Sequence, residues 1–473
     1  MNAGDFSPKG LKPTSLTYLR MVNYRMFKKV NIELHPGLCV FLGNNGSGKT
    51  SVLDAISFLI SSIFSLCDYV PKIRSLAYEL RNVRAHMEYK RGKSRLIRED
   101  VSGVVGTLTR YRKMESAEKI SSVCLSVGRK LSAQQDLCID YTIRQLATEF
   151  NERVRVDSSI PTFAHYGSHR GAEQGDRKRF ARRKIDYTNP FAAYINALHP
   201  SLDFDAFLEW FSEEEAAELR MQRKNKAYKS AELNAVRTAI VRVFETSDIK
   251  VKEPRFEDKP KRFVLTKVQP NGDELELEFD QLSDGYRAMI ALVADYARRL
   301  AIANQYSSQN PLEGEGILLI DEIDAHLHPK WQYRVIDDLR RTFPNVQLIV
   351  TTHSAEVVST VSRESVYILD TEDGEVTVTH PIEQTKGDYP EYIGGTAMGI
   401  PDNMWNHSEF QAYMNCLGCI KEDDTESEFF KEQRKQVIEA YGENHHFVRE
   451  IAARLNGLER KKSVIAKLKD KKQ

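Results

Sequence analysis

The sequence predicts an α/β fold in which a parallel sheet carries a phosphate-binding loop. Three segments indicate it: an apolar strand that enters a glycine-rich loop, an apolar strand that ends in carboxylates, and an apolar strand that ends in a histidine. They are LCVFLGNNGSGKTS (38–51), GILLIDEIDAHLHP (316–329) and VQLIVTTHS (346–354). Continuous apolar runs are typical of buried parallel strands, whose carboxyl ends meet at one edge of the sheet. We therefore expect these three strand ends to form one site.

Composition indicates a folded protein of two or three domains. The 473 residues are 41% hydrophobic and 29% charged, with a formal net charge of +1. Any contact with nucleic acid must therefore come from local basic patches. The most apolar segment, 51–67, includes Asp54, which favours a buried helix over a membrane span. Residues 1–13 lack the apolar core of a secretory signal, so we expect a cytoplasmic protein without membrane contact.

The cysteines predict free thiols. All six are scattered along the chain, as is typical of a reducing compartment. Cys416 and Cys419 form a C-x-x-C, but a zinc site would need two more ligands. His407, His445 and His446 lie in the same region without a paired spacing. Two buried thiols are the favoured interpretation.

The glycine loop 43–51 has the pattern G-x-x-x-x-G-K-[ST] between a strand and a helix. In that context the glycines let backbone N–H groups surround phosphates at a helix N-terminus. Lys49 supplies a cation for the β- and γ-phosphates, and Thr50 offers a hydroxyl to Mg²⁺. The alternative is a glycine-rich turn that merely precedes a helix. The candidate ATP-binding residues are Gly43, Asn44, Asn45, Gly46, Ser47, Gly48, Lys49, Thr50 and Ser51, together with Arg25 upstream.

Carboxylates at the end of the second strand suit a Mg²⁺-nucleotide site. Asp321 is expected to hold Mg²⁺ through water, and Glu322 to orient and polarise the attacking water. Asp324 lies on the loop beyond. His353 ends the third strand and is a candidate sensor of the γ-phosphate, although a single histidine is more often structural.

Three further segments predict other parts of the fold and a possible nucleic-acid contact. Residues 80–142 alternate apolar and polar residues, which predicts an antiparallel meander. Residues 190–247 have helical periodicity, and the stripe Phe207, Trp210 and Phe211 indicates helix packing rather than base stacking. The basic run 170–184 either contacts the phosphates of DNA or RNA or forms a solvated loop. Its candidate contacts are Arg177, Lys178, Arg179, Arg182 and Arg183.

The stretch QLSDGYRAM (281–289) completes a set that resembles the ATP-binding-cassette (ABC) ATPases, in their SMC/RecF/OLD-like branch. The resemblance implies a head-to-tail dimer in which Ser283, Asp284 and Gly285 of one subunit face the γ-phosphate held by Lys49 of the other. It makes Asp324 the D-loop residue. ATP would then join the two subunits and drive a conformational switch.

The chain departs from that family in two places. Where a glutamine loop is expected it reads YGSHR, so Ser168, His169 or Arg170 would have to substitute. The signature stretch has Asp284 where glycine is usual.

The contexts LSDGYR, HLHPKWQ and AHYGSHR resemble the PtuA-type ATPases of Septu anti-phage defence, also found beside some retrons. This implies an ABC-type head at 1–380 with an antiparallel β lobe and a helical insertion at about 187–250. A C-terminal helical region, 381–473, would form a partner or oligomer surface, or only a cap. The implied partner is a small HNH nuclease (PtuB-like). The ATPase, as a homodimer or a larger homo-oligomer, would regulate this nuclease and would have no nuclease centre of its own.

Two other functions stay open. One is a RecF-like, ATP-dependent DNA-binding repair or recombination protein, which would have no nuclease partner. The other is an ATPase that acts on RNA as a toxin or sensor. The basic run 170–184 fits DNA and RNA equally.

Overall fold

The computed structural model describes most of the chain. The described residues are 12–68, 87–90, 93–96, 102–113, 118–129, 137–139, 141–156, 158–168, 185–245, 250–259, 261–269, 271–307, 309–372, 375–396, 408–443 and 445–470.

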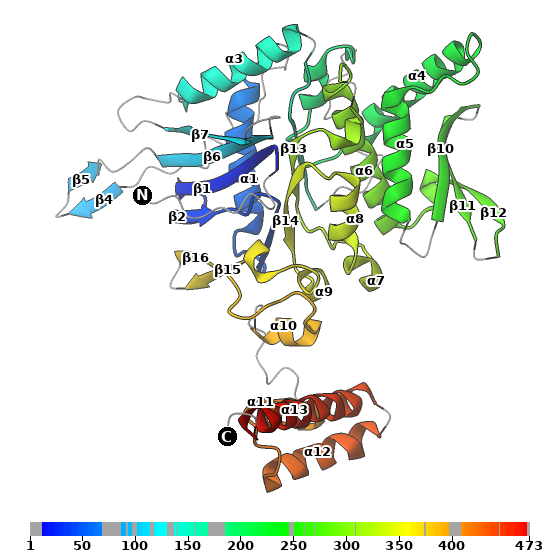
Figure 1. The fold of residues 1–473 in the computed structure, drawn as a ribbon. Helices are drawn as coiled ribbons and strands as arrows, with labels where there is room; N and C mark the ends of the chain where they lie inside the picture. The colour runs from blue at the N-terminus through cyan, green and yellow to red at the C-terminus, as the bar shows by residue number, and fades with distance from the viewer. Residues whose placement is uncertain are drawn as a thin grey trace. The chain divides into compact units, whose positions relative to one another are not determined.

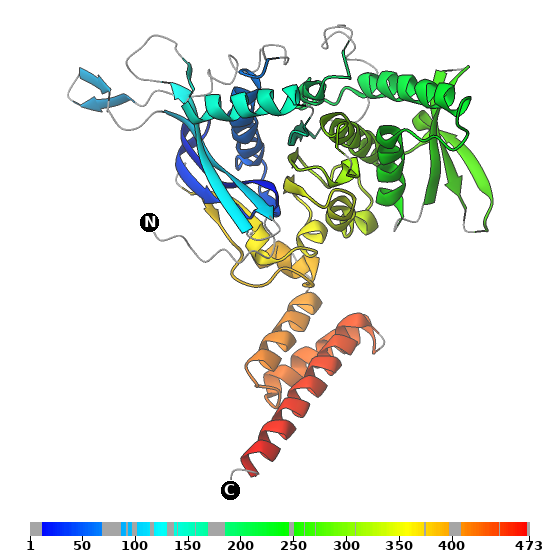
Figure 2. The same cartoon turned by 45° about the horizontal axis from the view of Figure 1, so that its top comes forward.

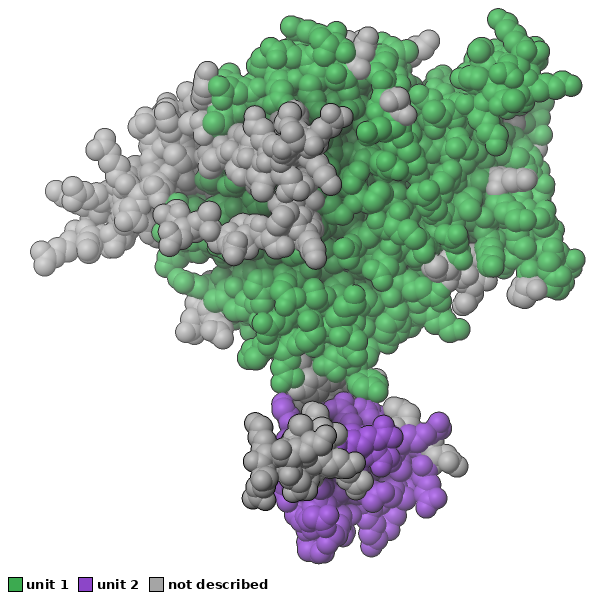
Figure 3. Space-filling model, viewed as in Figure 1, with its two compact units in different colours: residues 1–393 green, residues 394–473 purple. Residues whose placement is uncertain are grey.

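Two compact units divide the chain, Met1–Ile393 and Gly394–Gln473 (Figure 3). The boundary expected after residue 380 stays a prediction; in the structure, residues 381–393 bond to the first unit. Thr385 Oγ1, for example, donates a hydrogen bond to the Val361 carbonyl at 2.6 Å.

A six-stranded sheet forms the centre of the first unit, in the order β16-β15-β3-β14-β13-β9 (Figure 1). All neighbours are parallel except the edge pair β15–β16. At the carboxyl edge Leu42 pairs with Thr352, and Ile320 pairs with Tyr166. The three predicted strand ends therefore lie at one edge. The strands are β3 Leu38–Gly43, β9 Thr162–Tyr166, β13 Gly316–Ile320, β14 Val346–Thr352, β15 Val366–Glu372 and β16 Glu375–Thr379.

An antiparallel lobe adjoins this sheet, in the order β2-β1-β6-β7-β8. It contains the predicted meander, but β6 also pairs with the N-terminal strand β1. The lobe and a separate hairpin are built from β1 Thr14–Tyr24, β2 Phe27–Glu33, β4 Met87–Lys90, β5 Lys93–Leu96, β6 Ser102–Lys113, β7 Glu118–Arg129 and β8 Leu137–Ile139.

The helix after the glycine loop, α1 (Lys49–Phe64), packs against both the lobe strand β6 and the core strand β9. Its side chains are almost all buried, as expected for a core helix. A further helix, α3 (Tyr141–Arg155), packs against α1. Within the described residues, no helix is both long and apolar enough to cross a membrane.

The helical insertion contains a short 3-10 helix and, after it, two α-helices. The turn at 223–230 separates them, and Ser230 caps the second by accepting a hydrogen bond from Leu233 N at 3.2 Å. Phe207, Trp210 and Phe211 are buried, which confirms that this stripe serves helix packing. The insertion comprises η2 Pro190–Tyr194, α4 Phe204–Gln222 and α5 Ala231–Phe244.

A three-stranded antiparallel sheet follows the insertion and leads into the long helix α6 (Asp284–Ala303) (Figure 2). Its strands are β10 Lys250–Asp258, β11 Lys261–Val268 and β12 Glu274–Glu278. The remaining helices of the first unit are short: η3 Phe279–Gln281, η4 Pro311–Glu313, α7 Pro329–Gln332, α8 Val335–Thr342, α9 Ala355–Val358 and η5 Arg363–Ser365. Helix α10, Pro390–Thr396, includes the boundary between the two units.

From residue 408 on, the described part of the second unit contains three helices, α11 Ser408–Lys421, α12 Glu428–Tyr441 and α13 His446–Asp470. Cys416 and Cys419 lie within its apolar core, beside Phe430 and Ile451. Burial raises the pKa of the Cys416 thiol to about 11, so it stays protonated at neutral pH. Among the described residues no group of three or more His, Cys, Asp or Glu is arranged to hold a metal ion.

Candidate nucleotide site

The glycine loop is held against both sheets. Gly48 has φ 100°, and a Cβ there would lie 2.7 Å from Met26 Sδ, on the β1–β2 turn. A Cβ on Gly43 would lie 2.5 Å from the carbonyl oxygen of Leu369, on β15. Only glycine fits such approaches. The loop crest, Asn44 to Gly46, is exposed.

Lys49 begins α1 and folds back over the loop. Its Nζ donates to the carbonyl oxygens of Gly43 at 2.7 Å and Asn44 at 2.9 Å. Burial lowers the pKa of Lys49, although the carboxylates of Asp321 and Glu322 act in the opposite direction. Nearby, Ser47 is buried and its Oγ has no hydrogen-bond partner among the described residues.

Thr50 and Asp321, the two predicted Mg²⁺ ligands, contact each other. Thr50 Oγ1 donates to Asp321 Oδ2 at 2.9 Å. The other oxygen, Asp321 Oδ1, accepts from Thr351 Oγ1 at 2.5 Å. These residues are 271 and 30 positions apart in sequence, so it is the parallel sheet that brings them together.

Glu322 has an uncommon backbone conformation. Its φ is 48°, in the left-handed region that residues with a Cβ rarely adopt. The same Thr351 hydroxyl accepts a hydrogen bond from Glu322 N at 2.7 Å. Thr351 therefore fixes both predicted acidic residues. Sequence reasoning did not single it out, although a polar residue within the buried strand VQLIVTT was a signal.

Asp324 and His353 are also adjacent. Asp324 Oδ1 accepts hydrogen bonds from Thr352 Oγ1 at 2.6 Å and from the His353 backbone N–H at 3.3 Å. The His353 side chain is half-buried. The loop after β13 thus holds the loop after β14, and the two candidate residues come together.

The neighbouring strand β9 contacts helices on both of its faces. His165 Nδ1 and Ser57 Oγ of α1 are 2.9 Å apart, and burial lowers the pKa of His165 to about 4. On the opposite face, Tyr166 donates from its hydroxyl to Asp295 Oδ2 of α6 at 2.7 Å. The Tyr166 carbonyl also accepts from Asp321 N at 2.8 Å. These residues were not predicted; polar side chains in the buried run IPTFAHYG were the available signal.

Asp295 is the centre of a fully buried ionic cluster. Arg298 and Arg299 donate to its carboxylate at 2.5 Å and 2.7 Å, and all three are at most 3% exposed. Burial alone would raise the pKa of Asp295, but the charges of Arg299 and Arg298 outweigh it and hold the pKa at about 2.

The Leu-Ser-x-Gly stretch lies at the start of α6. Ser283 is exposed and its side chain makes no capping bond to α6. Asp284, also exposed, forms an ion pair with Arg287. Gly285 is buried, and a Cβ there would overlap the carbonyl oxygen of His326 on the Asp324 loop.

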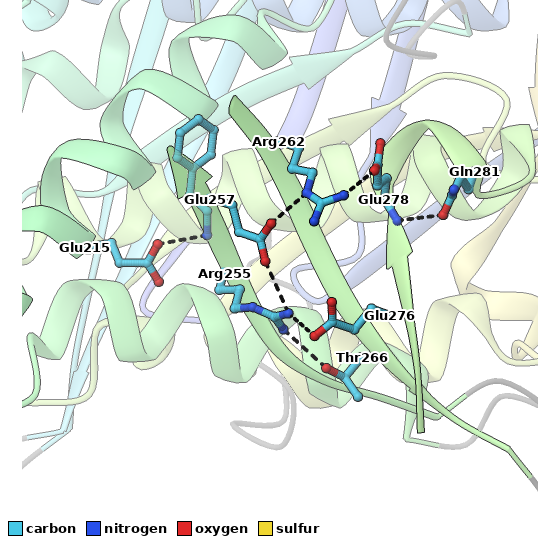
Figure 4. A network of polar contacts seen from close by, with 9 residues as sticks. Glu215, Arg255, Glu257, Arg262, Thr266, Glu276, Glu278 and Gln281 are labelled. Atoms are coloured by element: carbon cyan, nitrogen blue, oxygen red, sulfur yellow. Dashed lines mark hydrogen bonds and ion pairs between the residues drawn. The ribbon is translucent and has the colours of Figure 1, made fainter. Parts of the chain in front are cut away.

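A ladder of charged residues crosses the three-stranded sheet and ends beside this stretch (Figure 4). Arg262 donates to Glu257 at 2.6 Å and to Glu278 at 2.5 Å. Glu278 N then donates to Gln281 Oε1 at 3.0 Å. The ladder fixes the segment that enters the signature residues.

Arg25 lies on the turn against the loop, with φ 49°. It pairs with Asp54 of α1, so its contact with ATP stays a prediction. Within YGSHR, Ser168 is described, but His169 and Arg170 are not. The basic candidates Arg177, Lys178, Arg179, Arg182 and Arg183 also lie outside the described residues.

Comparison with known proteins identifies the family context. Residues 18–239 match the family described as "AAA domain", and residues 155–359 match "AAA domain, putative AbiEii toxin, Type IV TA system". Together the two matches span the glycine loop and all three strand ends.

Individual relatives indicate which ATPases the chain resembles. The chain is 27% identical over 427 residues to the "Retron Vc95 probable ATPase" of Vibrio cholerae serotype O1 biovar El Tor, covering 79% of this chain and 76% of the relative. The chain is thus similar in sequence to retron-associated ATPases over most of its length. A Septu protein PtuA from Bacillus mycoides (strain KBAB4) is 32% identical over 157 residues, 33% of this chain and 21% of that protein. The resemblance drawn from the motifs is confirmed, because the relatives include retron probable ATPases and Septu PtuA proteins.

Among solved structures, an SMC head bound to the C-winged helix domain of ScpA is similar over 77% of this chain and 98% of that one. Its TM-score is 0.42 at 17% identity. The predicted fold class is confirmed: the chain has a P-loop head of mixed α/β type, with an antiparallel lobe, a short helical insertion and a C-terminal helical region.

Proposed function

We propose that this chain is the ATP-binding and ATP-hydrolysing regulatory subunit of a bacterial anti-phage defence complex. In that complex it assembles with, and controls, a small HNH nuclease (PtuB-like) that cuts nucleic acid. The names of the retron and Septu relatives support the defence setting. The observation that carries the ATPase assignment is the contact of Thr50 with Asp321 beside the glycine loop.

The oxygens at this contact suit Mg²⁺. Mg²⁺ takes octahedral oxygen ligands at about 2.0–2.1 Å, so adjacent ligands lie about 2.9 Å apart. Thr50 Oγ1 and Asp321 Oδ2 have a separation of 2.9 Å, and Asp321 could act directly or through a water. When bound, Mg²⁺ would supply neutralising charge to the β- and γ-phosphates.

Other groups of the chain would bind the phosphates and position the attacking water. Backbone N–H groups of the loop bind phosphate oxygens at the N-terminus of α1. Lys49 Nζ exchanges the Gly43 and Asn44 carbonyls for the phosphates. Glu322 orients the attacking water, and His353 lies on the adjacent loop as sensor. Strain at Glu322 supports this role, because unusual backbone conformations concentrate at functional sites.

Ser283 supports a composite site between two copies. Its exposed hydroxyl makes no capping bond to α6, and a helix N-terminus favours an anion. We infer a homodimer, or a larger homo-oligomer, in which Ser283, Asp284 and Gly285 of one chain complete the nucleotide site of another. Strand β9 would connect the two halves of this machinery, because it bonds to α1 through His165 and to α6 through Tyr166.

Two variants test the ATPase roles. Lys49→Ala should abolish ATP binding, because it removes the cation for the phosphates. Glu322→Gln should keep ATP bound, stop hydrolysis and hold dimers together. Equilibrium binding of labelled ATP and the oligomeric state with ATP measure both effects. If the two variants bind nucleotide equally well, the assigned roles are wrong.

The partner is tested from the native locus. The tagged chain should recover a small HNH protein in stoichiometric amount, and we expect the second unit to provide the contact. A chain ending at residue 393 should therefore lose the partner while still binding ATP. Recovery of the chain alone, or only with DNA, would favour the RecF-like alternative. Full recovery by the shortened chain would exclude the second unit as the partner surface.

A further inference from the structure

The turn between α4 and α5 concentrates positive charge. Residues 220–229, RMQRKNKAYK, contain five cations and no carboxylate, in a chain whose formal net charge is only +1. All five cations are exposed: Arg220, Arg223, Lys224, Lys226 and Lys229. In Figures 1 and 3 this turn projects from the far end of α4 at the upper right of the first unit.

Glu232 of α5 lies just beyond the turn and accepts a hydrogen bond from Ser230 Oγ at 3.0 Å. Two carboxylates of α4 near the turn bond inward and do not neutralise its charge. Glu218 is 4% exposed and accepts from Arg237 Nη1 at 2.7 Å and from Ser230 N at 2.9 Å. Glu215 accepts from the same guanidinium at 2.5 Å and from Phe256 N at 2.8 Å. The two acids are thus engaged by Arg237 and by backbone N–H groups.

The turn is ordered by its own polar contacts. Asn225 Oδ1 accepts from Ala227 N at 3.1 Å, and Gln222 Nε2 donates to the Tyr228 carbonyl at 2.9 Å. Tyr228 N donates to the Asn225 carbonyl at 2.9 Å. A fixed backbone holds the five cations in one place, so less conformational entropy is lost when they bind a ligand.

The ligand class follows from what the turn presents. Five exposed cations, with no carboxylate within residues 220–229, favour a polyanion, and the regular phosphates of nucleic acid are the general case. Proteins that bind single strands add aromatic side chains on which bases stack. In this turn the aromatic residue, Tyr228, is half-buried and its carbonyl and N–H are both engaged in the turn. Phosphates of a duplex, whose bases are already stacked, fit this surface better.

We propose that the α4–α5 turn binds the phosphate backbone of double-stranded nucleic acid, without reading bases. This deepens the proposed function, since it assigns a duplex contact to the ATPase subunit itself. It places that contact on residues 220–229, apart from the run 170–184. Binding does not require ATP hydrolysis.

The test compares two triple charge reversals in the full chain. The turn variant is Arg223→Glu/Lys224→Glu/Lys226→Glu. The control is Lys421→Glu/Lys431→Glu/Lys435→Glu, three exposed lysines of the second unit with the same change in net charge. Affinity for fluorescent duplex DNA, duplex RNA and single-stranded DNA is measured over a range of salt concentrations. Labelled ATP binding checks that each variant is folded.

The turn variant should bind duplex at least about tenfold more weakly. Its salt dependence should be shallower by about 2–3 in the log–log slope, since each lost phosphate contact removes roughly 0.9. The control should bind like the wild type. Equal losses in both variants, an unchanged turn variant, or tighter wild-type binding to single strands would overturn the proposal. Failure of ATP binding in the wild type would instead refute the proposed function, whatever the duplex result.

Discussion

Thr351 shows how one hydroxyl organises the candidate site. It donates to Asp321 Oδ1 and accepts from the Glu322 N–H, which uses its donor and one acceptor site. Glu322 is held at φ 48°, a conformation that costs about 1–3 kcal/mol and persists only when its surroundings fix it. The Thr351 bond supplies part of that fixation.

Thr351→Val should therefore impair hydrolysis more than nucleotide binding. The change leaves a buried carboxylate oxygen and the Glu322 N–H without this partner, at a cost of about 1–3 kcal/mol. We expect kcat to fall roughly tenfold or more, while ATP affinity changes little. Thr351→Ser keeps the hydroxyl and should restore most of the rate. Steady-state kinetics check this, and a serine variant as slow as the valine variant would contradict it.

The residues of this site differ in how far sequence could predict them. The spacing in GNNGSGKTS predicts phosphate binding, and carboxylates after an apolar strand predict Mg²⁺ binding. Lys49, Thr50 and Asp321 could therefore be named from local sequence alone. Thr351 could not, because its role depends on the register of β14 beside β13, which joins residues 30 positions apart. The same limit applies to Tyr166 and Asp295, which are 129 positions apart.

Strand β9 and helix α6 are the elements that unite the site with the signature residues. Their contact contains the buried cluster of Asp295 with Arg298 and Arg299. Removing one member of a buried ionic cluster leaves an uncompensated charge, which typically costs 3–5 kcal/mol. Loss of Asp295 would leave two buried guanidinium groups without their carboxylate, whereas loss of one arginine would leave Asp295 paired with the other. Replacing Asp295 is therefore the more damaging change.

Asp295→Asn should lower the free energy of unfolding by about 3–5 kcal/mol at neutral pH. The pKa of Asp295 in the folded chain, about 2, is below its ordinary value of 3.8. Its charge therefore contributes stability above pH 4, and that contribution is lost as pH falls toward 2. The gap between wild type and variant should narrow over that range.

Urea unfolding midpoints from pH 7 to pH 2 measure this gap. Asp337→Asn, at an exposed aspartate of α8, is the matched control and should show little effect. A gap that is absent at pH 7, or that widens in acid, would contradict the account of this cluster.

Sequence periodicity predicted most elements, but not where they stop. The run 190–247 has helical spacing throughout, yet the chain turns at 223–230, where Asn225 and Ser230 bond to nearby backbone N–H groups. The contact of Thr385 with Val361 is tertiary, so the sequence could not show that residues near 385 bond to the first unit. The hairpin of β11 and β12, in contrast, has a local turn signal in Asn271-Gly272.

At the scale of the whole molecule, the proposed function requires two copies to share each nucleotide. One copy would provide the glycine loop with Thr50 and Asp321, and the other would provide the exposed Ser283. Stacking two chains in this way would couple ATP occupancy to assembly, and through the second unit to a nuclease. The basic α4–α5 turn would add contact with the duplex on which that nuclease acts.

The most direct test of the shared site mixes two inactive variants. Lys49→Ala removes the phosphate-binding cation, and Ser283→Arg blocks the signature contact. Alone, each should hydrolyse no ATP. In a mixed dimer one site combines an intact glycine loop with an intact signature, so an equal mixture should regain up to roughly one quarter of wild-type activity. No recovery in verified mixed dimers would show that each chain forms its site alone.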